Sequence, residues 1–205
     1  MEEPRKPENP NFTNLLIFAT GSVATIKLPL LVQSLSEFDV NIRVIVSPSA
    51  TRFLFAEDIQ SIEKIAPIYR NEDEWAQPWA RGDTVLHIEL RKWAEVMLIA
   101  PLSANSLAAM AAGMCPGLGL SVVRAWDTTM RKKILVAPAM NTQMWLHPLT
   151  AQQLDVLRSW GWVKILDPVA KLLACGDLGV GGMMEVTDII AEVIKEVELV
   201  KMNDV

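Results

Sequence analysis

The chain is poor in the residues that build metal sites and disulfide frameworks. It holds two cysteines, Cys115 and Cys175, and two histidines, His87 and His147, and the members of each pair lie far apart in the sequence. Without clustered ligands no metal site is expected. Without an export signal, a disulfide between two distant cysteines is not expected either.

Long apolar runs are also missing. A membrane-spanning helix needs about 18 or more consecutive apolar residues, and no stretch of this sequence reaches that length. The first residues, MEEPRKPENPNF, are polar and contain proline, unlike a secretory signal peptide. We therefore expect a cytoplasmic protein with no membrane partner.

Positive charge is not in excess. The 19 lysine and arginine residues are outnumbered by 24 aspartate and glutamate residues, which gives a net charge of −5, and the basic residues are scattered along the chain. Nucleic-acid-binding domains usually carry a basic stripe or patch. No nucleic-acid partner is therefore expected.

The composition is that of one globular domain. Of the 205 residues, 51% are hydrophobic and 21% are charged, which is enough for one sizeable core. Residues 1–13 contain too few apolar side chains to pack and are predicted to form a disordered tail. Residues 14–205 are predicted to form the domain.

Five short apolar runs alternate with helical patterns. The runs cover residues 15–19, 41–46, 96–100, 133–137 and 162–166 and are predicted to be strands covered on both faces. Helices are predicted near residues 24–37, 51–55, 104–113, 118–126, 147–161 and 187–200. Residues 56–82 show no clear period and are expected to form a long connection, whereas residues 83–93 alternate like an extended strand. With no hairpin signal, this order predicts a single-domain α/β fold with a doubly wound, mostly parallel sheet of Rossmann or flavodoxin-like type.

Polar turns follow three of the predicted strands, at the strand ends where such sheets bind ligands. Gly21 and Ser22 lie between the first strand and a helix, where free backbone N–H groups and the helix dipole can hold a phosphate. Ser47 and Ser49 follow the second strand, and the sequence SANS at residues 103–106 follows the third. The alternative is structural: the glycine serves the turn geometry and the serines cap helices.

The sequence PAMNTQMW, residues 138–145, follows the fourth predicted strand. Pro138 stops the apolar run, and Asn141 stands between Met140 and Met144. This order predicts a buried strand that delivers one polar group to its carboxyl end. Alternatively, the methionines fill the core and Asn141 caps the following helix.

Two further segments carry reactive side chains. His87 begins the sequence HIELRKWA, residues 87–94, where its charged neighbours are also compatible with a solvated face. Cys175 lies within ACGDLGVGGM, residues 174–183, a glycine-rich segment that is either a mobile surface loop or a lid that closes over a site.

Four of these segments, at residues 87–94, 103–106, 138–145 and 174–183, resemble the signatures of the homo-oligomeric flavin-containing cysteine decarboxylases. The family has HIELR(R/K)WA, SANT, PxMNxxMW and ACGDxGxGxM in this order, and the resemblance extends over about residues 15–197. It implies non-covalent FMN and a substrate with a C-terminal cysteine, 4′-phospho-N-pantothenoylcysteine, which is decarboxylated to 4′-phosphopantetheine in coenzyme A biosynthesis. It also implies a homotrimer, or a dodecamer built from trimers, with each active site shared between neighbouring subunits.

The resemblance implies a role for individual residues as well. It makes His87 and Cys175 the catalytic residues. The substrate-binding residues that it implies are Asn141, Met144, Lys171, Leu172, Ala174 and Met183. The FMN-binding residues that it implies are Gly21, Ser22, Val23, Ser47, Ser49, Ser103, Ala104, Asn105, Ser106, Ala139 and Met140.

The chain departs from the family at two places. Pro116 and Gly117 stand where its members usually have an acidic and an amide residue, in a sequence close to CDNLL. Leu172 replaces a frequent basic residue, which leaves Lys171 as the nearest candidate for holding a substrate phosphate. The first departure keeps an alternative open, a non-catalytic flavin-binding subunit with a regulatory or interaction role. A flavin decarboxylase that acts on a peptide cysteine is a further alternative.

Overall fold

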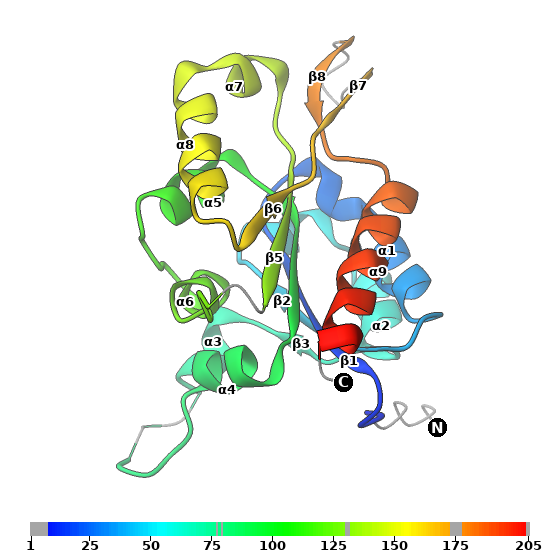
Figure 1. Ribbon diagram of the computed structural model, residues 1–205, viewed down its shortest axis with the longest axis vertical. Coiled ribbons are helices and arrows are strands. Elements are labelled where there is room, and N and C mark those ends of the chain that lie inside the picture. Colours follow the sequence, from blue (N-terminus) through cyan, green and yellow to red (C-terminus); the bar gives the residue numbers. More distant parts are fainter. Residues whose placement is uncertain (1–7, 77, 79, 130–131, 173–177, 204–205) are drawn as a thin grey trace.

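A six-stranded parallel sheet forms the centre of the protein (Figure 1). The structure is a computed structural model that describes residues 8–203 except 77, 79, 130–131 and 173–177, with only the backbone of residues 171, 172, 178 and 203. The strand order is β3-β2-β1-β4-β5-β6, and all neighbouring strands are parallel. This is the order of the doubly wound Rossmann fold, so the predicted fold class is confirmed. The strands are Thr13–Ala19 (β1), Val40–Val46 (β2), Ile68–Tyr69 (β3), Val96–Leu102 (β4), Lys133–Pro138 (β5) and Val163–Ile165 (β6).

Helices cover both faces of the sheet. Side chains alternate along β1, so that Leu15 and Ile17 belong to one buried cluster and Leu16 and Phe18 to the other. Helices α1, α2 and α9 pack on the first face, and α4, α5, α6 and α8 on the second (Figure 1). Their bounds are Leu28–Leu35 (α1), Ala56–Glu63 (α2), Leu86–Trp93 (α4), Ala104–Ala111 (α5), Leu118–Arg124 (α6), Pro148–Ser159 (α8) and Val186–Asn203 (α9).

Short helical turns follow the strands at the carboxyl edge of the sheet. The helix predicted over residues 24–37 is divided into a 3-10 helix, η1 (Val23–Lys27), and α1, which has Pro29 in its first turn as expected. A second 3-10 helix, η2 (Ala50–Phe53), follows β2, and α7 (Thr142–Leu146) follows β5. None of the described helices has both the length and the hydropathy required to cross a bilayer.

The extended strand predicted over residues 83–93 is wrong, because residues 86–93 form helix α4. Leu86, Leu90 and Trp93 recur at the helical spacing of four and three, and all three belong to the cluster on the second face of the sheet. The backbone N–H groups of Ile88 and Glu89 both donate to the carbonyl of Val85, each at 3.0 Å, which closes the first turn. A period of two and a period of 3.6 both include Leu86 and Leu90, so the alternation alone did not distinguish a strand from a helix.

Regular elements also occupy the predicted connection at residues 56–82. It contains α2, the sheet strand β3 and a four-residue helix, α3 (Asn71–Glu74). Helix α2 begins where the backbone N–H of Phe55 donates to Asp58 Oδ2 at 2.9 Å, and it buries Ile62 as its main apolar contact. One buried residue on an eight-residue helix and a two-residue strand leave little periodicity for a sequence to show.

The glycine-rich segment near the carboxyl terminus contains an antiparallel hairpin that the sequence did not predict. Its strands are β7 (Val169–Leu172) and β8 (Leu178–Gly182). In Figure 1 the hairpin stands beside α7, beyond the carboxyl ends of the sheet strands. Ala174 and Cys175 lie outside the described residues.

Helix α9, which follows the hairpin, is attached to the edge strand β6 by charged groups. Lys164 Nζ lies 2.9 Å from Glu192 Oε2 and 2.9 Å from Glu196 Oε1. Burial alone would lower the pKa of Lys164, but hydrogen bonds to both carboxylates outweigh burial and raise this pKa. The pKa of Glu192 is lowered by its hydrogen bonds to Lys195 and Lys164. Helix α9 is therefore fixed to the edge of the sheet.

Part of the predicted tail contacts the sheet. Glu8 Oε1 lies 2.9 Å from Nε of Arg43 on β2, and the backbone N–H of Asn9 donates to Asn41 Oδ1 at 2.8 Å. The Arg43 guanidinium also lies over the ring of Trp93 at 4.1 Å. Residues 1–7 lie outside the described part of the chain.

Candidate active site

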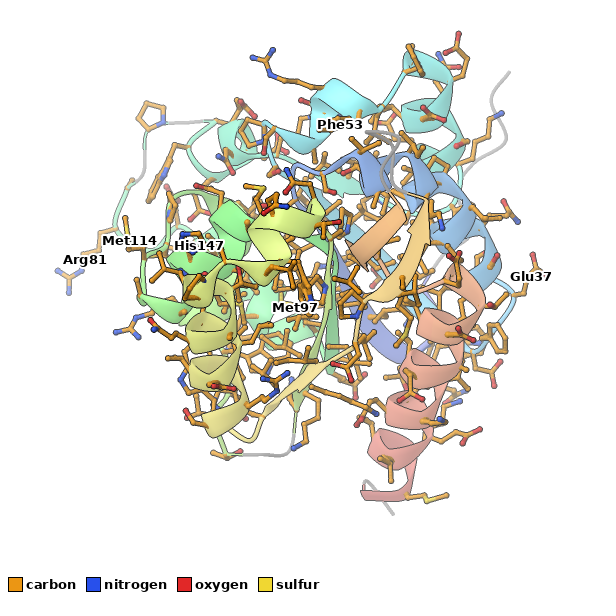
Figure 2. The ribbon with its side chains drawn as sticks, turned by 90° about the horizontal axis from the view of Figure 1, so that it is seen from above. Glu37, Phe53, Arg81, Met97, Met114 and His147 are labelled. Carbon is orange, nitrogen blue, oxygen red and sulfur yellow. The ribbon has the colours of Figure 1, made fainter. Side chains whose placement is uncertain are left out.

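A pocket of about 730 Å³ opens at the carboxyl ends of the parallel strands. The turns after β1, β2, β4 and β5 line it, together with the end of β8. Strands β1 and β4 are neighbours whose crossovers leave in opposite directions, which is where doubly wound sheets bind ligands. Figure 2 looks down onto this end of the sheet and labels Phe53 of the lining. The volume falls within the range of cofactor and small-molecule sites, about 300–1,000 Å³.

The structure brings most of the predicted site residues together in this pocket. They come from four separate turns and from the end of the hairpin. Those in the lining are Gly21, Ser22, Val23, Ser49, Ser103, Ala104, Asn105, Ala139, Met140, Asn141, Met144 and Met183.

The turn after β1 is fixed to the turn after β4 through one buried hydroxyl. Thr20 is fully buried, and its Oγ1 donates to the carbonyl of Pro101 at 2.8 Å and accepts from the backbone N–H of Ser103 at 2.7 Å. The backbone N–H of Thr20 donates to the same Pro101 carbonyl at 3.1 Å. Two of the turns that the sequence marked as ligand-binding are therefore held at a fixed separation.

Gly21 leaves room for the turn after β2. A Cβ atom at this position would lie 2.4 Å from Ser49 Oγ and 2.5 Å from Ser49 Cβ, closer than real Cβ atoms approach. Ser22 caps η1, because its Oγ accepts from the backbone N–H of Ala24 at 3.4 Å. Ser47 makes a structural contact: its Oγ accepts from the backbone N–H of Ala50 at 3.2 Å, and Ser47 is not among the pocket residues in the described chain.

Helix α5 begins at the pocket with a serine cap. Ser103 Oγ accepts from the backbone N–H of Ser106 at 3.2 Å and donates to Ser106 Oγ at 3.1 Å. Both serines are buried, and Ser106 does not reach the described pocket lining. The structural interpretation of these two hydroxyls therefore holds. Ala104 and Asn105 face the pocket at the positive end of the helix dipole.

Asn141 has both properties that the sequence left as alternatives. It lines the pocket and it caps a helix, although the helix is α7 rather than the one that begins at Pro148. Its Oδ1 accepts from the backbone N–H of Met144 at 2.9 Å. The amide oxygen is thereby used by the fold, and the NH₂ group is the part of the side chain that can donate to a ligand. His147 caps α8 through Nδ1, which accepts from the backbone N–H of Leu149 at 3.2 Å.

Two glycines let β8 close one side of the pocket. The backbone N–H of Met140 donates to the carbonyl of Gly181 at 2.9 Å, and Gly181 has a φ of 110°, which favours glycine. A Cβ atom on Gly181 would lie 2.6 Å from the Met140 carbonyl oxygen. A Cβ atom on Gly179 would lie 2.0 Å from Thr142 Oγ1. The glycine-rich sequence therefore serves close packing against the segment that carries Asn141.

His87 does not line the described pocket of its own chain. It lies in α4, which with α3 occupies the end of the molecule away from α7 and the hairpin (Figure 1). Lys171 and Leu172 belong to β7 and only their backbone is described, whereas Ala174 and Cys175 fall outside the described residues. The structure thus assembles the cofactor side of the predicted site and separates it from the predicted base.

The departure at Pro116 and Gly117 lies beside α3 and not in the described pocket lining. Gly117 has a φ of 96°, and a Cβ atom there would lie 2.5 Å from Asn71 Nδ2. Asn71 Oδ1 accepts from the backbone N–H of Leu118 at 3.0 Å, so a side chain of α3 supplies the contact at the start of α6. The changed loop therefore leaves the turns of the pocket untouched.

Sequence reasoning missed several pocket residues, namely Ala24, Ile26, Lys27, Phe53, Gly181 and Gly182. Lys27 is half-buried, and its Nζ lies 2.8 Å from Glu185 Oε2. Ile26 and Lys27 lie in η1, the 3-10 helix that directly follows the Gly21 turn. Their spacing from that turn was the available indication.

Comparisons with known proteins identify the family of this chain. A sequence profile of the flavoprotein family matches residues 3–198. The chain belongs to the flavoprotein family. Within this family, it is 46% identical over 180 residues to the phosphopantothenoylcysteine decarboxylase of Mus musculus, covering 87% of this chain and 84% of that protein. The same enzyme of Oryza sativa subsp. japonica is 44% identical over 177 residues, covering 86% of this chain and 77% of that protein.

Solved structures of flavoproteins share the fold. A PPC decarboxylase mutant complexed with pantothenoylaminoethenethiol superposes with a TM-score of 0.83 at 42% identity, covering 89% of this chain and 97% of that chain. The FMN binding protein AtHal3 gives a TM-score of 0.79 at 43% identity, covering 88% of this chain and 94% of that chain.

Proposed function

We propose that this flavoprotein is a phosphopantothenoylcysteine decarboxylase, which uses FMN to convert 4′-phospho-N-pantothenoylcysteine to 4′-phosphopantetheine and CO₂ in coenzyme A biosynthesis. The observation that carries the proposal is the convergence of Asn141 with the turns at Gly21 and Ser103 in one pocket. Relatives that bear this enzyme's name are similar over most of the chain. We place the enzyme in the cytoplasm.

The features of the pocket fit FMN. Backbone N–H groups at the Gly21 turn and in the first turn of α5 can bind a phosphate, and Ile26, Phe53 and Met140 offer apolar surface for a ring system. FMN, when bound, supplies a two-electron oxidation of the substrate thiol to a thioaldehyde, whose C=S group lies β to the carboxylate and accepts its electrons, and it later returns the two electrons. The residues that would hold it are those of the four turns.

Asn141 is suited to hold the substrate carboxylate. Its oxygen is engaged by the backbone of Met144, so the NH₂ group donates. An amide orients a carboxylate without forming the strong ion pair that would stabilise the ground state and slow the loss of CO₂. Met144 and Met183 contribute apolar surface beside it.

We assign the proton transfers to His87 and Cys175. A neutral imidazole accepts the proton of the substrate thiol as the thiol is oxidised. A protonated cysteine thiol donates a proton when the enethiolate formed by loss of CO₂ is reduced.

We infer that the enzyme is a homotrimer whose active sites are shared between subunits. His87 does not line the described pocket of its own chain, so the base comes from a neighbouring subunit. Large apolar side chains are exposed around the pocket, with exposed fractions of 58% for Ile26 and 63% for Leu146. Covering this surface with a second copy is favourable.

Incubation of the FMN-loaded protein with 4′-phospho-N-pantothenoylcysteine tests the function. We expect the product to have lost CO₂ alone, as measured by mass spectrometry. A product that has lost CO₂ and two hydrogens would mean that the reductive half of the cycle is missing. A colourless protein that FMN cannot reconstitute would contradict the whole mechanism. A yellow protein without turnover would favour the alternative function, a non-catalytic flavin-binding subunit.

Substitution of Gly21 tests the cofactor turn. We expect Gly21→Ala to weaken FMN binding by about 5- to 150-fold, because overpacking costs about 1–3 kcal/mol and the new Cβ meets Ser49. Titration of apoprotein with FMN measures this. Gly82→Ala is the control: no atom lies within 4 Å of a Cβ there, but its φ of 106° strains alanine, so stability falls while FMN affinity stays. Equal FMN affinity in the wild type, Gly21→Ala and Gly82→Ala would mean that the FMN phosphate does not bind at the Gly21 turn.

A further inference from the structure

His87 is held by a carboxylate of a neighbouring helix. Glu74 Oε1 lies 2.6 Å from His87 Nδ1, and Glu74 Oε2 accepts from the backbone N–H of His87 at 3.1 Å. The Glu74 side chain is only 7% exposed, whereas the imidazole is 25% exposed. Each oxygen of one buried carboxylate therefore fixes a different part of the same residue.

Helix α3, which carries Glu74, is itself fixed at both ends. The backbone N–H of Arg70 donates to Asp73 Oδ2 at 2.6 Å, which closes the turn that begins the helix. Asn71 bonds to the start of α6, as described above, and Glu74 bonds to the start of α4. A four-residue helix has little stability of its own, so these contacts to two longer helices determine where the carboxylate lies.

The geometry defines the protonation of the imidazole ring. An ionised carboxylate can only accept hydrogen bonds, so in the neutral ring Nδ1 carries the proton and Nε2 keeps its lone pair. The other charged side chains nearby on α4 have partners of their own: Arg91 Nε donates to the carbonyl of Ala125 at 2.8 Å, and Glu89 pairs with Lys92. The contact that sets the tautomer is therefore the one with Glu74.

We propose that Glu74 is a positioning residue that holds His87 with Nε2 ready to accept a proton. The inference rests on the proposed function, in which the substrate thiol gives its proton to His87. Transfer breaks the S–H bond and forms an Nε2–H bond, which leaves an imidazolium whose Nδ1–H still faces the Glu74 carboxylate. The carboxylate remains ionised throughout and does not touch the substrate.

The tautomer is observable without any activity. Because the chain has only two histidines, a protein grown with ring-¹⁵N histidine and no affinity tag shows two imidazole rings by NMR, each with an Nδ1 and an Nε2 signal. Wild-type His87 should show a protonated Nδ1 and an unprotonated Nε2. His147 should show the opposite tautomer, because its Nδ1 accepts from Leu149, and His147→Asn assigns its signal. An Nε2–H tautomer at His87 in the wild-type protein would overturn the proposal, and this outcome needs no variant that must fold.

Glu74→Gln then tests the consequence for catalysis. Glutamine keeps the shape but can accept from Nδ1 or donate to it, so the His87 signal should shift toward a mixture of tautomers. We expect kcat for CO₂ release to fall about tenfold or more while KM changes less than about twofold, because the substrate contacts are kept. Glu72→Gln removes the same charge from an exposed site on the same helix and should change neither quantity.

Loss of kcat without a change of tautomer would make Glu74 a structural residue and overturn the proposal. An unchanged kcat would overturn it as well. A wild-type protein with the Nδ1–H ring that releases no CO₂ from 4′-phospho-N-pantothenoylcysteine would remove the proposed function while leaving the assignment of the ring correct. The two failures are thus distinguishable.

Discussion

The His87→Asn variant is expected to release CO₂ about 10²- to 10⁴-fold more slowly than the wild type, the usual contribution of a general base. Asparagine fits the space of the imidazole but cannot accept the thiol proton. FMN should stay bound, because no residue of α4 belongs to the described turns that are proposed to hold the cofactor. Release of ¹⁴CO₂ from carboxyl-labelled substrate measures the rate, and the flavin absorbance measures the bound cofactor.

His147→Asn is the matched control for this variant. His147 caps α8 with Nδ1, and asparagine is a good helix cap, so neither activity nor stability should change much. Turnover of His87→Asn within tenfold of the wild type would reassign His87 to a structural role. Loss of FMN from His87→Asn would show that α4 affects the cofactor turns, which the structure does not predict.

The pocket turns could be predicted because their sequence patterns are local. A buried parallel strand is a continuous apolar run, as in β1, where Leu15, Leu16 and Ile17 are fully buried. Such a run followed by Gly21 and Ser22 indicates both the strand end and the turn. Since all six strands are parallel, successive turns fall on the same edge, and the convergence of distant segments follows from the strand pattern alone.

Other elements could not be predicted because their determinants are not local. The two-residue strand β3 exists because Ile68 and Tyr69 pair with Val44 and Ile45 of β2, a partner more than 20 residues away. The hairpin strand β8 is rich in glycine, which disfavours strands. Its place depends on the close approach of Gly181 to Met140, a contact that only the fold reveals.

The site residues also differ in whether their roles depend on local sequence or on contacts between distant segments. Asn141, Ser49 and Ser103 were predictable as pocket residues, but the hydroxyls of Ser47, Ser103 and Ser106 are engaged in hydrogen bonds within the fold, and only that of Ser103 caps a helix. Glu74 lies 13 residues before His87, in a stretch of acidic residues that resembles a solvated surface. Its burial depends on α3 meeting α4, which no spacing in the sequence encodes.

Two inactive variants are expected to restore activity to each other when they are expressed together. His87→Asn lacks the base, and Asn141→Asp places a carboxylate against the carboxylate of the substrate, while aspartate still caps α7. If each site takes His87 from one subunit and Asn141 from its neighbour, some sites in a mixed trimer contain both intact residues. If both residues came from one chain, every site would carry a lesion.

The size of the recovery follows from random mixing. A productive site needs an Asn141→Asp chain on the side that supplies His87 and a His87→Asn chain on the side that supplies Asn141. Each condition is met half of the time, so equal expression should restore about one quarter of wild-type turnover per site. Purified variants mixed afterwards should recover less where trimers exchange subunits slowly, which separates assembly from contamination by wild type.

Co-expression of the wild type with a double variant carrying both substitutions gives a second, independent value. A shared site again needs the wild-type chain on both sides, so turnover should fall to about one quarter, whereas a site within one chain would keep about one half. Native mass spectrometry confirms that mixed trimers have formed. Mixed trimers without recovery in the first experiment, or with one half in the second, would rule out the shared site. The exposed apolar surface around the pocket, which includes Ile26 and Leu146, would then need another explanation.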